Sequence, residues 1–308
     1  MDNAITTRSL VKTYRRPRQA PVNAVDGIDL DIRFGECYCL LGPNGAGKST
    51  TVEILEGARR ATSGEVSVLG YTPYDAPAAF RARIGVVLQE ASDGSHFTVE
   101  QTVRQLARLY PRPTDIEGVI SGVGLGEKSG EKVKNLSGGQ RRRLDVALGL
   151  VGHPEILFLD EPTTGFDPRS RRQFWELMRT LHGDGTTIVL TTHYLDEAEA
   201  LADRIGIIDR GIMIAEGSPR TLGGPDARVP RVRWIDAAGS AREERTTTPT
   251  ALIAELTPTD GSEISELEIQ RPSLEDAYLD LIGRPDTEDG DASESHDSPI
   301  TATEGSAR

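Results

Sequence analysis

Cysteine, aromatic residues and long apolar runs are all scarce in this chain. Its 308 residues include 2 cysteines, and aromatic residues make up 5% of the composition. Cys37 and Cys39 cannot form a disulfide framework, and because they share one face of an expected strand they suit core packing better than a metal or redox site. No apolar run approaches the length of about 20 residues that a membrane-spanning helix needs. Residues 1–4 show neither the basic nor the apolar part of a signal peptide, so we expect a protein that is made and kept in the cytosol.

An excess of basic charge is also absent. The chain carries 35 Lys and Arg against 48 Asp and Glu, which gives a formal net charge of -13 and a pI near 5.0. Because nucleic-acid binding relies on clustered Lys and Arg that neutralise phosphates, we do not expect nucleic acid as a partner. The length fits one large domain with a smaller appendage.

A glycine-rich segment after an apolar run carries the strongest functional signal. It reads Gly42, Pro43, Asn44, Gly45, Ala46, Gly47, Lys48, Ser49 and Thr50. The pattern is G-x-x-x-x-G-K-[ST], and its place between an expected strand and an expected helix favours a phosphate-binding loop over an ordinary turn. Glycines let backbone N–H groups converge on phosphate oxygens, and the helix start adds its positive end. We predict that Lys48 contacts the β- and γ-phosphates of a nucleotide and that the Ser49 hydroxyl binds Mg²⁺.

Hydrophobic periodicity predicts an α/β fold. Strands are expected at residues 5–11, 25–32, 37–41, 64–69, 84–88, 156–159, 186–190, 204–209 and 212–215. Helices are expected from residue 51, from 98 to about 110, and at 137–151, 168–182 and 195–202, with residues 114–135 loosely helical. Strands alternate with helices after residue 35, which is typical of a parallel core sheet, and antiparallel strands flank it. Functional residues should then gather at the carboxyl ends of the core strands.

The composition changes after Pro225. Short strands at 231–235 and 264–269 and short helices at 250–256 and 273–282 predict a small α/β module. Residues 284–308 contain many Asp, Glu and Ser and almost no large apolar side chains. Such a segment cannot bury enough surface to order itself, so a disordered acidic tail is favoured over a regulatory segment.

A second anion-binding pattern lies further along the chain. It reads Leu136, Ser137, Gly138, Gly139 and Gln140. Two glycines behind a serine cap leave helix N–H groups open to an anion. Because one phosphate cannot easily meet both patterns within one compact chain, the pair suggests a site that is completed by a second copy of the protein.

Polar side chains end three expected core strands. Asp160 is suited to hold Mg²⁺ through water, and Glu161 beside it is placed to accept a proton from an attacking water. Gln89 would bring an amide to the same metal and water, and His193 could donate to the γ-phosphate. Each of these residues also has an ordinary structural reading, and it is their combination with the two glycine-rich patterns that indicates nucleotide hydrolysis.

These motifs, in this order, resemble those of the nucleotide-binding subunits of ABC transporters, over residues 5 to about 220. The resemblance implies a P-loop NTPase fold of ABC type, with a parallel core sheet, an antiparallel β subdomain and an inserted helical subdomain at about 92–152. It implies an ATP-binding domain over residues 1–225, followed by the small α/β module at 226–283 and the acidic tail at 284–308.

The resemblance also implies a role for each motif. Tyr14 matches the aromatic residue that stacks on adenine, and residues 42–50 match the Walker A loop. Residues 136–140 match the signature motif, which contacts the ATP held by a second copy. Gln89 matches the lid glutamine that touches Mg²⁺ and faces the membrane partner.

The remaining motifs follow the same resemblance. Asp160 matches the Walker B acid, Glu161 the catalytic base and His193 the switch histidine. Residues 164–167 match the D-loop, although Phe166 stands where leucine is usual, an apolar exchange that should cost little. The polar stretch 90–97 has no firm match, so the contact with the membrane partner is not placed residue by residue.

The ending of the module, residues 271–279, resembles ATPases that work with ABC-2 type permeases, including drug and antibiotic-resistance exporters. The resemblance therefore implies ATP and Mg²⁺ as cofactors, a separate integral membrane permease as partner, and a peripheral place on the cytoplasmic face of the membrane. A capped amphipathic helix that simply closes a domain would also explain this stretch.

Two other functions fit part of the pattern. A soluble ABC-type mechanical ATPase acting in translation or DNA repair would normally carry long coiled coils or two ATPase domains, and this chain has neither. A phosphate-loop kinase would have no use for residues 136–140 or for His193.

Overall fold

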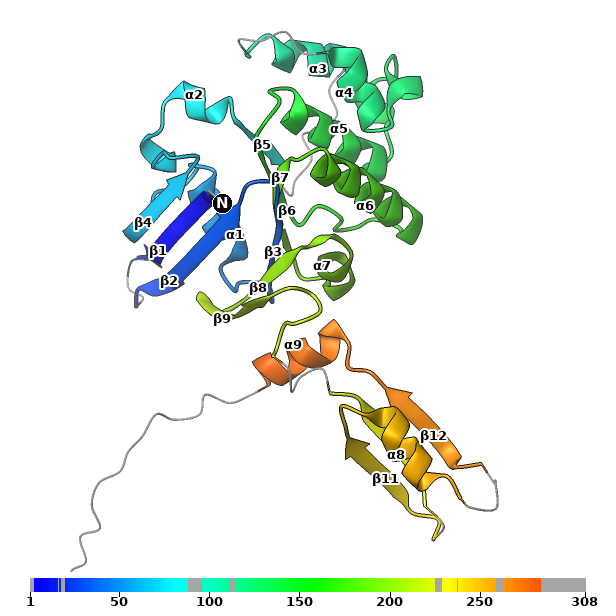
Figure 1. The fold of residues 1–308 in the computed structure, drawn as a ribbon. Helices are drawn as coiled ribbons and strands as arrows, with labels where there is room; N and C mark the ends of the chain where they lie inside the picture. The colour runs from blue at the N-terminus through cyan, green and yellow to red at the C-terminus, as the bar shows by residue number, and fades with distance from the viewer. Residues whose placement is uncertain are drawn as a thin grey trace, which may run out of the picture.

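The computed structural model describes residues 3–15, 17, 20–87, 96–110, 115–224, 229–236, 238–258 and 263–283. These residues form a main body with two sheets and a smaller carboxyl-terminal module that projects from it (Figure 1). Helix α6 (Pro168–Gly183) is the longest helix among the described residues, with 16 residues. None of the described helices is both long enough and apolar enough to cross a bilayer.

The central sheet of the main body has six strands in the order β5-β6-β7-β3-β8-β9. They are β3 (Cys37–Leu41), β5 (Ile84–Val87), β6 (Ile156–Asp160), β7 (Thr187–Thr192), β8 (Arg204–Asp209) and β9 (Ile212–Gly217). Neighbouring strands are parallel from β5 across to β8, and β9 returns antiparallel along the edge. Because β6, β7 and β3 are neighbours that run the same way, the segments that follow them meet at one edge of the sheet.

A second, antiparallel sheet lies at the amino-terminal side of the main body, with the order β2-β1-β4. Its strands are β1 (Asn3–Tyr14), β2 (Val22–Arg33) and β4 (Ser63–Val68). The first two extend beyond the ranges expected from the sequence, because their pairing continues until Tyr14 lies opposite Val22. This places Tyr14 at the end of a paired strand.

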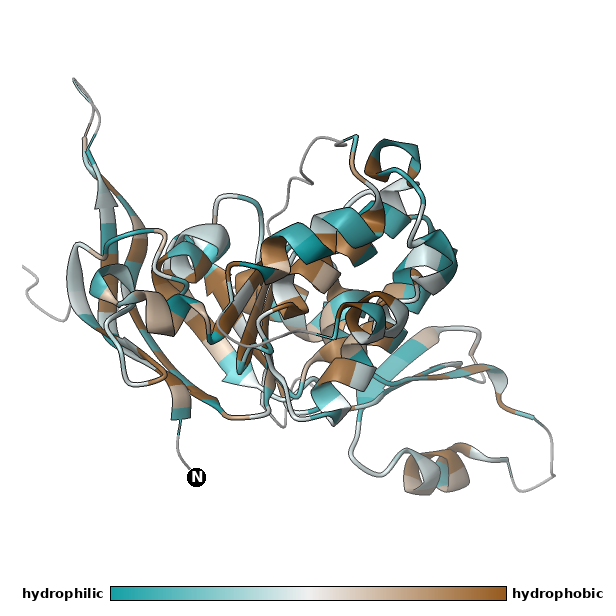
Figure 2. Cartoon of the chain, turned by 90° about the horizontal axis from the view of Figure 1, so that it is seen from above, coloured by the Kyte–Doolittle hydropathy of each residue, from teal (hydrophilic) through white to brown (hydrophobic). Residues whose placement is uncertain are grey.

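The two faces of the central sheet bury different layers. Along β3, Tyr38 and Leu40 join the cluster formed with the amino-terminal sheet and α1, whereas Cys37, Cys39 and Leu41 join the cluster formed with the other helices. The covering helices are α1 (Lys48–Leu55), α5 (Gly138–Leu150), α6 (Pro168–Gly183) and α7 (Leu195–Leu201). Figure 2 shows apolar strands at the centre and hydrophilic residues on the outer sides of helices. Both cysteines are buried free thiols, as predicted for core packing.

Shorter helices complete the main body. They are α2 (Ala78–Arg81), α3 (Val99–Ala107) and α4 (Ile116–Gly122), with the 3-10 turns η1 (Pro73–Asp75), η2 (Gly126–Lys128) and η3 (Val133–Asn135). Thr98 caps α3 through a reciprocal capping box with Gln101, as its sequence indicates. The helix ends at Ala107, earlier than the expected end near residue 110, because the chain turns there and the main-chain N–H of Tyr110 donates to the Ala107 carbonyl.

The carboxyl-terminal module combines a three-stranded sheet, order β11-β10-β12, with two helices. They are β10 (Arg231–Ile235), β11 (Ala241–Arg245), β12 (Ser265–Gln270), α8 (Pro249–Leu256) and α9 (Leu274–Ile282). The sequence did not predict β11, because all five of its residues are exposed and apolar and polar residues do not alternate along it. The predicted boundary at residue 225 and the acidic tail lie outside the described residues.

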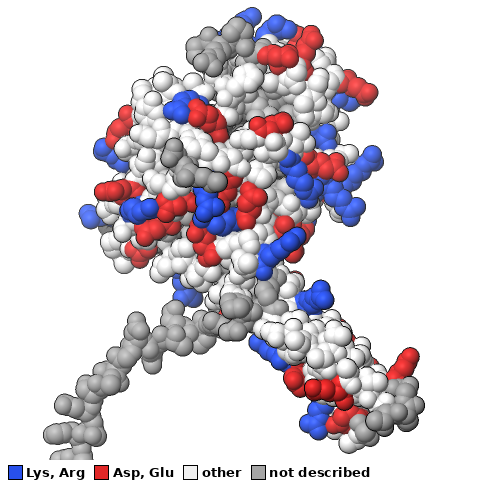
Figure 3. Space-filling model, viewed as in Figure 1, with Lys and Arg blue, Asp and Glu red and all other residues white. Residues whose placement is uncertain are grey.

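The module is joined to the main body through its last helix. In α9, Leu274 and Ala277 are buried, and Leu274 belongs to the same cluster as the helices of the central sheet. The helix contacts α7 and β9. The rest of the module projects outward, with acidic and basic side chains interspersed on its surface and on that of the main body (Figure 3).

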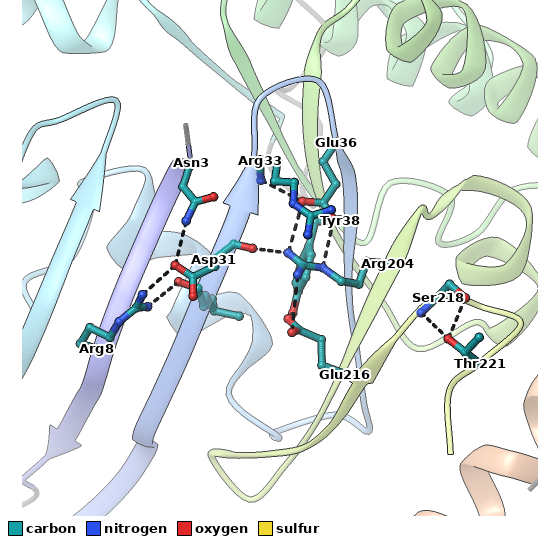
Figure 4. A network of polar contacts seen from close by, with 11 residues as sticks. Asn3, Arg8, Asp31, Arg33, Glu36, Tyr38, Arg204, Glu216, Ser218 and Thr221 are labelled. Atoms are coloured by element: carbon teal, nitrogen blue, oxygen red, sulfur yellow. Dashed lines mark hydrogen bonds and ion pairs between the residues drawn. The ribbon is translucent and has the colours of Figure 1, made fainter. Parts of the chain in front are cut away.

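A polar network ties the two sheets together (Figure 4). Arg204 Nε lies 3.0 Å from Glu36 Oε1 and its Nη1 lies 3.7 Å from Glu216 Oε2. The same guanidinium donates to the main-chain oxygen of Asp31 and lies over the Tyr38 ring. Tyr38 in turn donates to Glu216 at 2.6 Å. Since these residues belong to or adjoin β2, β3, β8 and β9, the network fixes the amino-terminal sheet against the central one.

Candidate functional site

The phosphate loop, residues 42–50, connects β3 to α1. Gly47 precedes the helix with a φ of 107°, a left-handed value that glycine adopts easily. The N–H of Ala46 donates to the Pro43 carbonyl at 3.2 Å and closes the turn. No side chain among the described residues caps the start of α1. Its first N–H groups are therefore open to an anion.

Two glycines of the loop are required by close approach of other backbone. A Cβ at Gly42 would lie 2.1 Å from the carbonyl oxygen of Ile208, and one at Gly47 would lie 2.2 Å from that of Ala24. Both distances are far below the van der Waals contact distance between a carbon and an oxygen atom, so no side chain larger than the hydrogen of glycine fits at these positions. Glycine is thus required at positions 42 and 47 because the backbones of β8 and β2 approach the loop closely there.

Lys48 lies beneath the loop, with its side chain 4% exposed. Its ammonium group donates to the carbonyl oxygens of Gly42 at 2.8 Å and Pro43 at 3.1 Å, and lies 3.7 Å from Glu161 Oε1. Burial lowers the pKa of Lys48, and the carboxylates of Glu161 and Asp160 oppose that shift. The loop therefore holds a buried cation against two of its own carbonyl oxygens and beside Glu161.

Oxygen ligands gather beside the lysine. The Ser49 hydroxyl donates to Asp160 Oδ1 at 3.1 Å, and the Thr191 hydroxyl donates to the same carboxylate oxygen. The described residues contain no group of three or more His, Cys, Asp or Glu that could cage a metal. A Mg²⁺ ion usually binds through one or two protein oxygens together with substrate phosphates and water, so a hydroxyl next to a carboxylate fits this ion.

Glu161 follows β6 with a φ of 42°, which is strained for a residue with a side chain. Its N–H is held by the main-chain and side-chain oxygens of Thr191, at 3.2 and 3.1 Å. Its carboxylate, 11% exposed, faces Lys48 on one side and His193 on the other, where Nδ1 lies 3.3 Å from Oε2. In this conformation the carboxylate lies beside Lys48, and Glu161 lines one cavity together with the phosphate loop.

A cavity of about 320 Å³ opens over these groups. It is lined by Ala24, Asn44, Gly45, Gly47, Lys48, Ser49, Thr50 and Glu161. Its wall thus joins the glycine-rich loop, the cation and the acidic residue that follows β6.

Tyr14 lies at the margin of this region. Its hydroxyl is 3.5 Å from the Thr50 hydroxyl. Two cations face its ring, with the Arg59 guanidinium 5.2 Å and the Lys12 ammonium 5.5 Å from the ring centroid. The ring therefore stands next to the last residue of the loop, where the base of a bound nucleotide could reach it.

The second glycine-rich pattern forms the start of α5. The N–H of Gln140 donates to the Ser137 hydroxyl at 3.3 Å, and the N–H of Ser137 donates to the Gln140 side chain at 3.0 Å. Gly138 and Gly139 form the first turn, and Leu136 is buried. In the described part of the chain, these residues do not line the cavity over the phosphate loop. One chain alone therefore does not bring the two patterns to one phosphate.

Arg142 connects this helix to the acidic strand end. Its side chain is buried and donates to the main-chain oxygens of Pro162 at 3.0 Å and Asp160 at 2.9 Å. A displacement of α5 would therefore move or break the hydrogen bonds that Arg142 makes to Asp160 and Pro162, the residues on either side of Glu161.

The segment 164–167 leads from β6 into α6. The Phe166 ring meets Phe174 edge to face, with centroids 5.9 Å apart. Asp167 caps α6 by accepting the N–H of Ser170 at 3.0 Å, and the hydrogen bonds that it accepts lower its pKa. An aromatic residue at position 166 is thus accommodated by a neighbouring ring.

The structure therefore brings together the phosphate loop, Asp160, Glu161 and His193, as the sequence predicted, while Gln89 lies outside the described residues. Sequence reasoning assigned no part to Thr191 or Arg142. Thr191 carries a signal, since it is a polar residue directly after the apolar run Ile188–Leu190 of its strand. The sequence gives little sign of the role of Arg142, because charged residues are common in the first turns of a helix.

Residues 25–164 match the family described as ABC transporter. The chain is 40% identical over 312 residues to the daunorubicin/doxorubicin resistance ATP-binding protein DrrA of Streptomyces peucetius, which covers 92% of this chain and 93% of that relative. It is 38% identical to the Nod factor export ATP-binding protein I of Neorhizobium galegae, covering 91% of this chain and 85% of that relative.

Solved structures agree on the fold. A dimeric ATP-binding cassette in a post-hydrolysis state, bound to ADP and Pi, superposes with a TM-score of 0.63 at 26% identity, over 70% of this chain and 98% of that one. A cassette described as the ATP-binding subunit of an ABC transporter gives a TM-score of 0.61 at 25% identity, over 70% of this chain and 90% of that one.

Proposed function

The chain belongs to the ABC transporter family, and from that premise we propose that it hydrolyses ATP to power a separate membrane permease of ABC-2 type in export. The observation that carries the proposal is the 40% identity to a drug-resistance ATP-binding protein over 92% of this chain. That likeness extends well beyond residues 25–164, which any ABC ATPase would be expected to match. A drug, antibiotic or other amphiphile is the proposed cargo, and the proposed location is the cytoplasmic face of the membrane, where the permease holds the chain.

ATP binding would begin at the phosphate loop. The open N–H groups at the start of α1 and the ammonium group of Lys48 would contact the β- and γ-phosphates, and Tyr14 would stack on the adenine ring. Ser49 and Asp160 would hold Mg²⁺, with Gln89 as a further ligand, and the ion would neutralise charge that develops on the phosphates. Lys48 and Ser49 line one cavity, Asp160 accepts a hydrogen bond from Ser49, and the Tyr14 hydroxyl lies 3.5 Å from that of the lining residue Thr50. Gln89 lies outside the described residues.

Hydrolysis would proceed by in-line attack of water on the γ-phosphorus, a reaction that needs mainly positioning and charge stabilisation. Glu161 would orient this water and accept its proton, because its carboxylate lies beside Lys48. His193, whose Nδ1 lies 3.3 Å from that carboxylate, would contact the γ-phosphate. The position of α7, which follows His193, would then depend on whether the γ-phosphate is bound.

A second copy of the chain would complete the site. The first turn of α5, at residues 137–140, carries N–H groups suited to the γ-phosphate, yet it does not line the cavity of its own chain among the residues described. Two copies packed head to tail would place each signature helix over the other's ATP. Hydrolysis would remove the γ-phosphate that joins them, and the bound permease would convert closing and opening into transport.

The test is to express the chain with and without the open reading frame that neighbours its gene. We expect the chain to sediment with membranes only when a six-span permease is present, and the washed membranes to hydrolyse ATP and lower the cellular content of an amphiphilic drug. A Lys48→Ala chain should sediment equally but restore neither activity. Recovery of the chain with ribosomes or DNA instead would favour a mechanical ATPase of the same superfamily.

A further inference from the structure

A buried hydroxyl group contacts both acidic residues at the carboxyl end of β6. Thr191, in β7, is 0% exposed and pairs in register with Asp160 of the neighbouring strand. Its hydroxyl donates to Asp160 Oδ1 and accepts the main-chain N–H of Glu161 at 3.1 Å. One side chain from β7 therefore bonds to the residue proposed to hold Mg²⁺ and to the residue proposed to activate water.

The direction of these two hydrogen bonds follows from the groups involved. A carboxylate can only accept a hydrogen bond and a main-chain N–H can only donate one, whereas a hydroxyl does both. The Thr191 hydroxyl therefore gives its one proton to Asp160 and offers a lone pair to Glu161. A side chain of the same shape without the hydroxyl would lose both bonds at once.

Both bonds act on features that matter for the proposed chemistry. Asp160 Oδ1 also accepts the Ser49 hydroxyl at 3.1 Å, so two donors from different segments fix the orientation of this carboxylate. Glu161 has a φ of 42°, and such sparsely populated conformations persist where several contacts determine them together. Its N–H is shared between the main-chain oxygen and the hydroxyl oxygen of Thr191, at 3.2 and 3.1 Å.

We propose that Thr191 is a positioning residue, whose hydroxyl fixes the Asp160 carboxylate for Mg²⁺ and the Glu161 main chain for ATP hydrolysis. The inference rests on the proposed roles of those two residues and adds the group that sets their relative placement. Hydrogen-bond partners of metal ligands affect metal affinity and activity, and a displacement of about 1 Å in reacting groups can cost about a hundredfold in rate. Thr191 can thus govern turnover without touching the nucleotide.

The alternative is that the Thr191 hydroxyl serves only the stability of the central sheet. A second threonine of β7 separates the two explanations. Thr187, at the other end of the strand, is also 0% exposed, and its hydroxyl accepts the N–H of Gly35 at 2.9 Å. Valine at either position removes a buried hydroxyl and deprives a main-chain N–H of an acceptor. A loss of stability would be common to both variants, whereas a loss of metal binding and turnover would be specific to position 191.

The experiment uses the full chain and compares Thr191→Val, Thr191→Ser and Thr187→Val with the parent. Phosphate release gives kcat, and the thermal midpoint reports stability. Calorimetric titration of Mg²⁺ into the chain loaded with an equimolar non-hydrolysable ATP analogue gives the Kd for the metal. We expect Thr191→Val to lower kcat and to raise the Kd for Mg²⁺, each by about tenfold. Thr191→Ser keeps the hydroxyl and should retain most of both, and Thr187→Val should match the parent in both.

A folded Thr191→Val chain in which either quantity is parental would overturn the inference, as would equal losses in Thr191→Ser or in Thr187→Val. If Thr191→Val does not fold, Thr191→Ala takes its place, and equal kcat values for the alanine and serine variants would overturn the inference. A parent chain that binds ATP but does not hydrolyse it, with or without permease, would instead contradict the proposed function. The Mg²⁺ titration would then still decide whether Thr191 fixes Asp160.

Discussion

The ammonium group of Lys48 lies 3.7 Å from Oε1 of Glu161, although one residue follows β3 and the other follows β6. The two strands are separated by β7 in the central sheet, so the contact spans its carboxyl edge. A γ-phosphate that binds Lys48 would therefore also lie beside Glu161. The Lys48 ammonium and the Glu161 carboxylate, the proposed base, would therefore act on the same phosphate.

Removing the carboxylate of Glu161 should separate binding from turnover. Glu161→Gln keeps the shape of the side chain but cannot accept a proton, so we expect ATP binding to persist and kcat to fall by about 10² or more. Phosphate release measures turnover, and light scattering in Mg-ATP should detect a dimer, since hydrolysis no longer parts the copies. Glu176→Gln, at an exposed position of α6, is the control. Parental turnover in Glu161→Gln would mean that another group is the base.

Removing the Lys48 ammonium should abolish nucleotide binding. Lys48→Ala deletes the buried cation that would face the phosphates, together with its hydrogen bonds to the Gly42 and Pro43 carbonyl oxygens. A charge-assisted contact of this kind contributes about 2 kcal/mol or more, so we expect the Kd for ATP, measured by titration calorimetry, to rise at least about thirtyfold. Lys128→Ala, at an exposed site, should leave the Kd unchanged. An unaltered Kd in Lys48→Ala would place ATP elsewhere.

Two glycines of the loop should respond differently to a methyl group. At Gly47 a Cβ would lie 2.2 Å from the carbonyl oxygen of Ala24, whereas at Gly45 no atom lies within 4 Å. Both have a positive φ, which costs a residue with a side chain about 1 kcal/mol. We expect Gly45→Ala to lose about this much stability, and Gly47→Ala to lose more and to bind ATP at least tenfold more weakly, roughly 1.4 kcal/mol. Denaturant unfolding and ATP titration measure both effects, and equal behaviour of the two variants would contradict the close approach of β2.

Deleting the Arg204 side chain should destabilise the junction of the two sheets. Arg204→Met leaves the buried Glu36 carboxylate without its partner, and breaking such a pair from one side costs about 3 kcal/mol. Urea denaturation measures the loss. Arg210→Met is the control, because that arginine lies on the same hairpin with its side chain 85% exposed. The double variant Arg204→Met with Glu36→Gln should recover part of the loss, and a failure to recover any would show that the pair does not account for it.

Stability should fall as pH rises between about pH 4 and 6 through Asp145. Burial raises the pKa of this carboxyl group from 3.8 to about 6, although Arg142 and Arg141 oppose the shift. The folded chain therefore retains a proton that the unfolded chain has lost, so the stabilisation present below pH 3.8 disappears as the pH passes through 6. Asp145→Asn should flatten the pH dependence of the free energy of unfolding in this interval and stabilise the protein at pH 7. An unchanged slope would mean that Asp145 is ionised in the fold.

The local elements were largely predictable, because their signals lie within a few residues of one another. The capping boxes at Thr98, Ser137 and Ser273 begin helices where their sequences indicate. The apolar run before Gly42 is a fully buried strand. The exposed strand β11 was missed, since its residues show no periodicity and its pairing with β10 depends on a partner strand.

The amino-acid sequence by itself determined the chemistry available to this protein. Glycines at 42 and 47 allow a tight anion-binding turn, Lys48 supplies a cation, and acidic residues follow an apolar strand at 160 and 161. These are properties of residue type and short spacing. Together with Gln89, residues 136–140 and His193, in that order along the chain, they were enough to indicate the family.

Only the tertiary structure decided how these groups meet. The order of the central sheet places β7 between β6 and β3, and this brings Thr191 onto Asp160 and Lys48 beside Glu161. The positive φ of Glu161 and the network around Arg204 likewise depend on segments that are distant in the chain. Strand order and burial are set by the packing of the whole fold, because the free energy of each contact depends on partners that no local stretch of sequence contains.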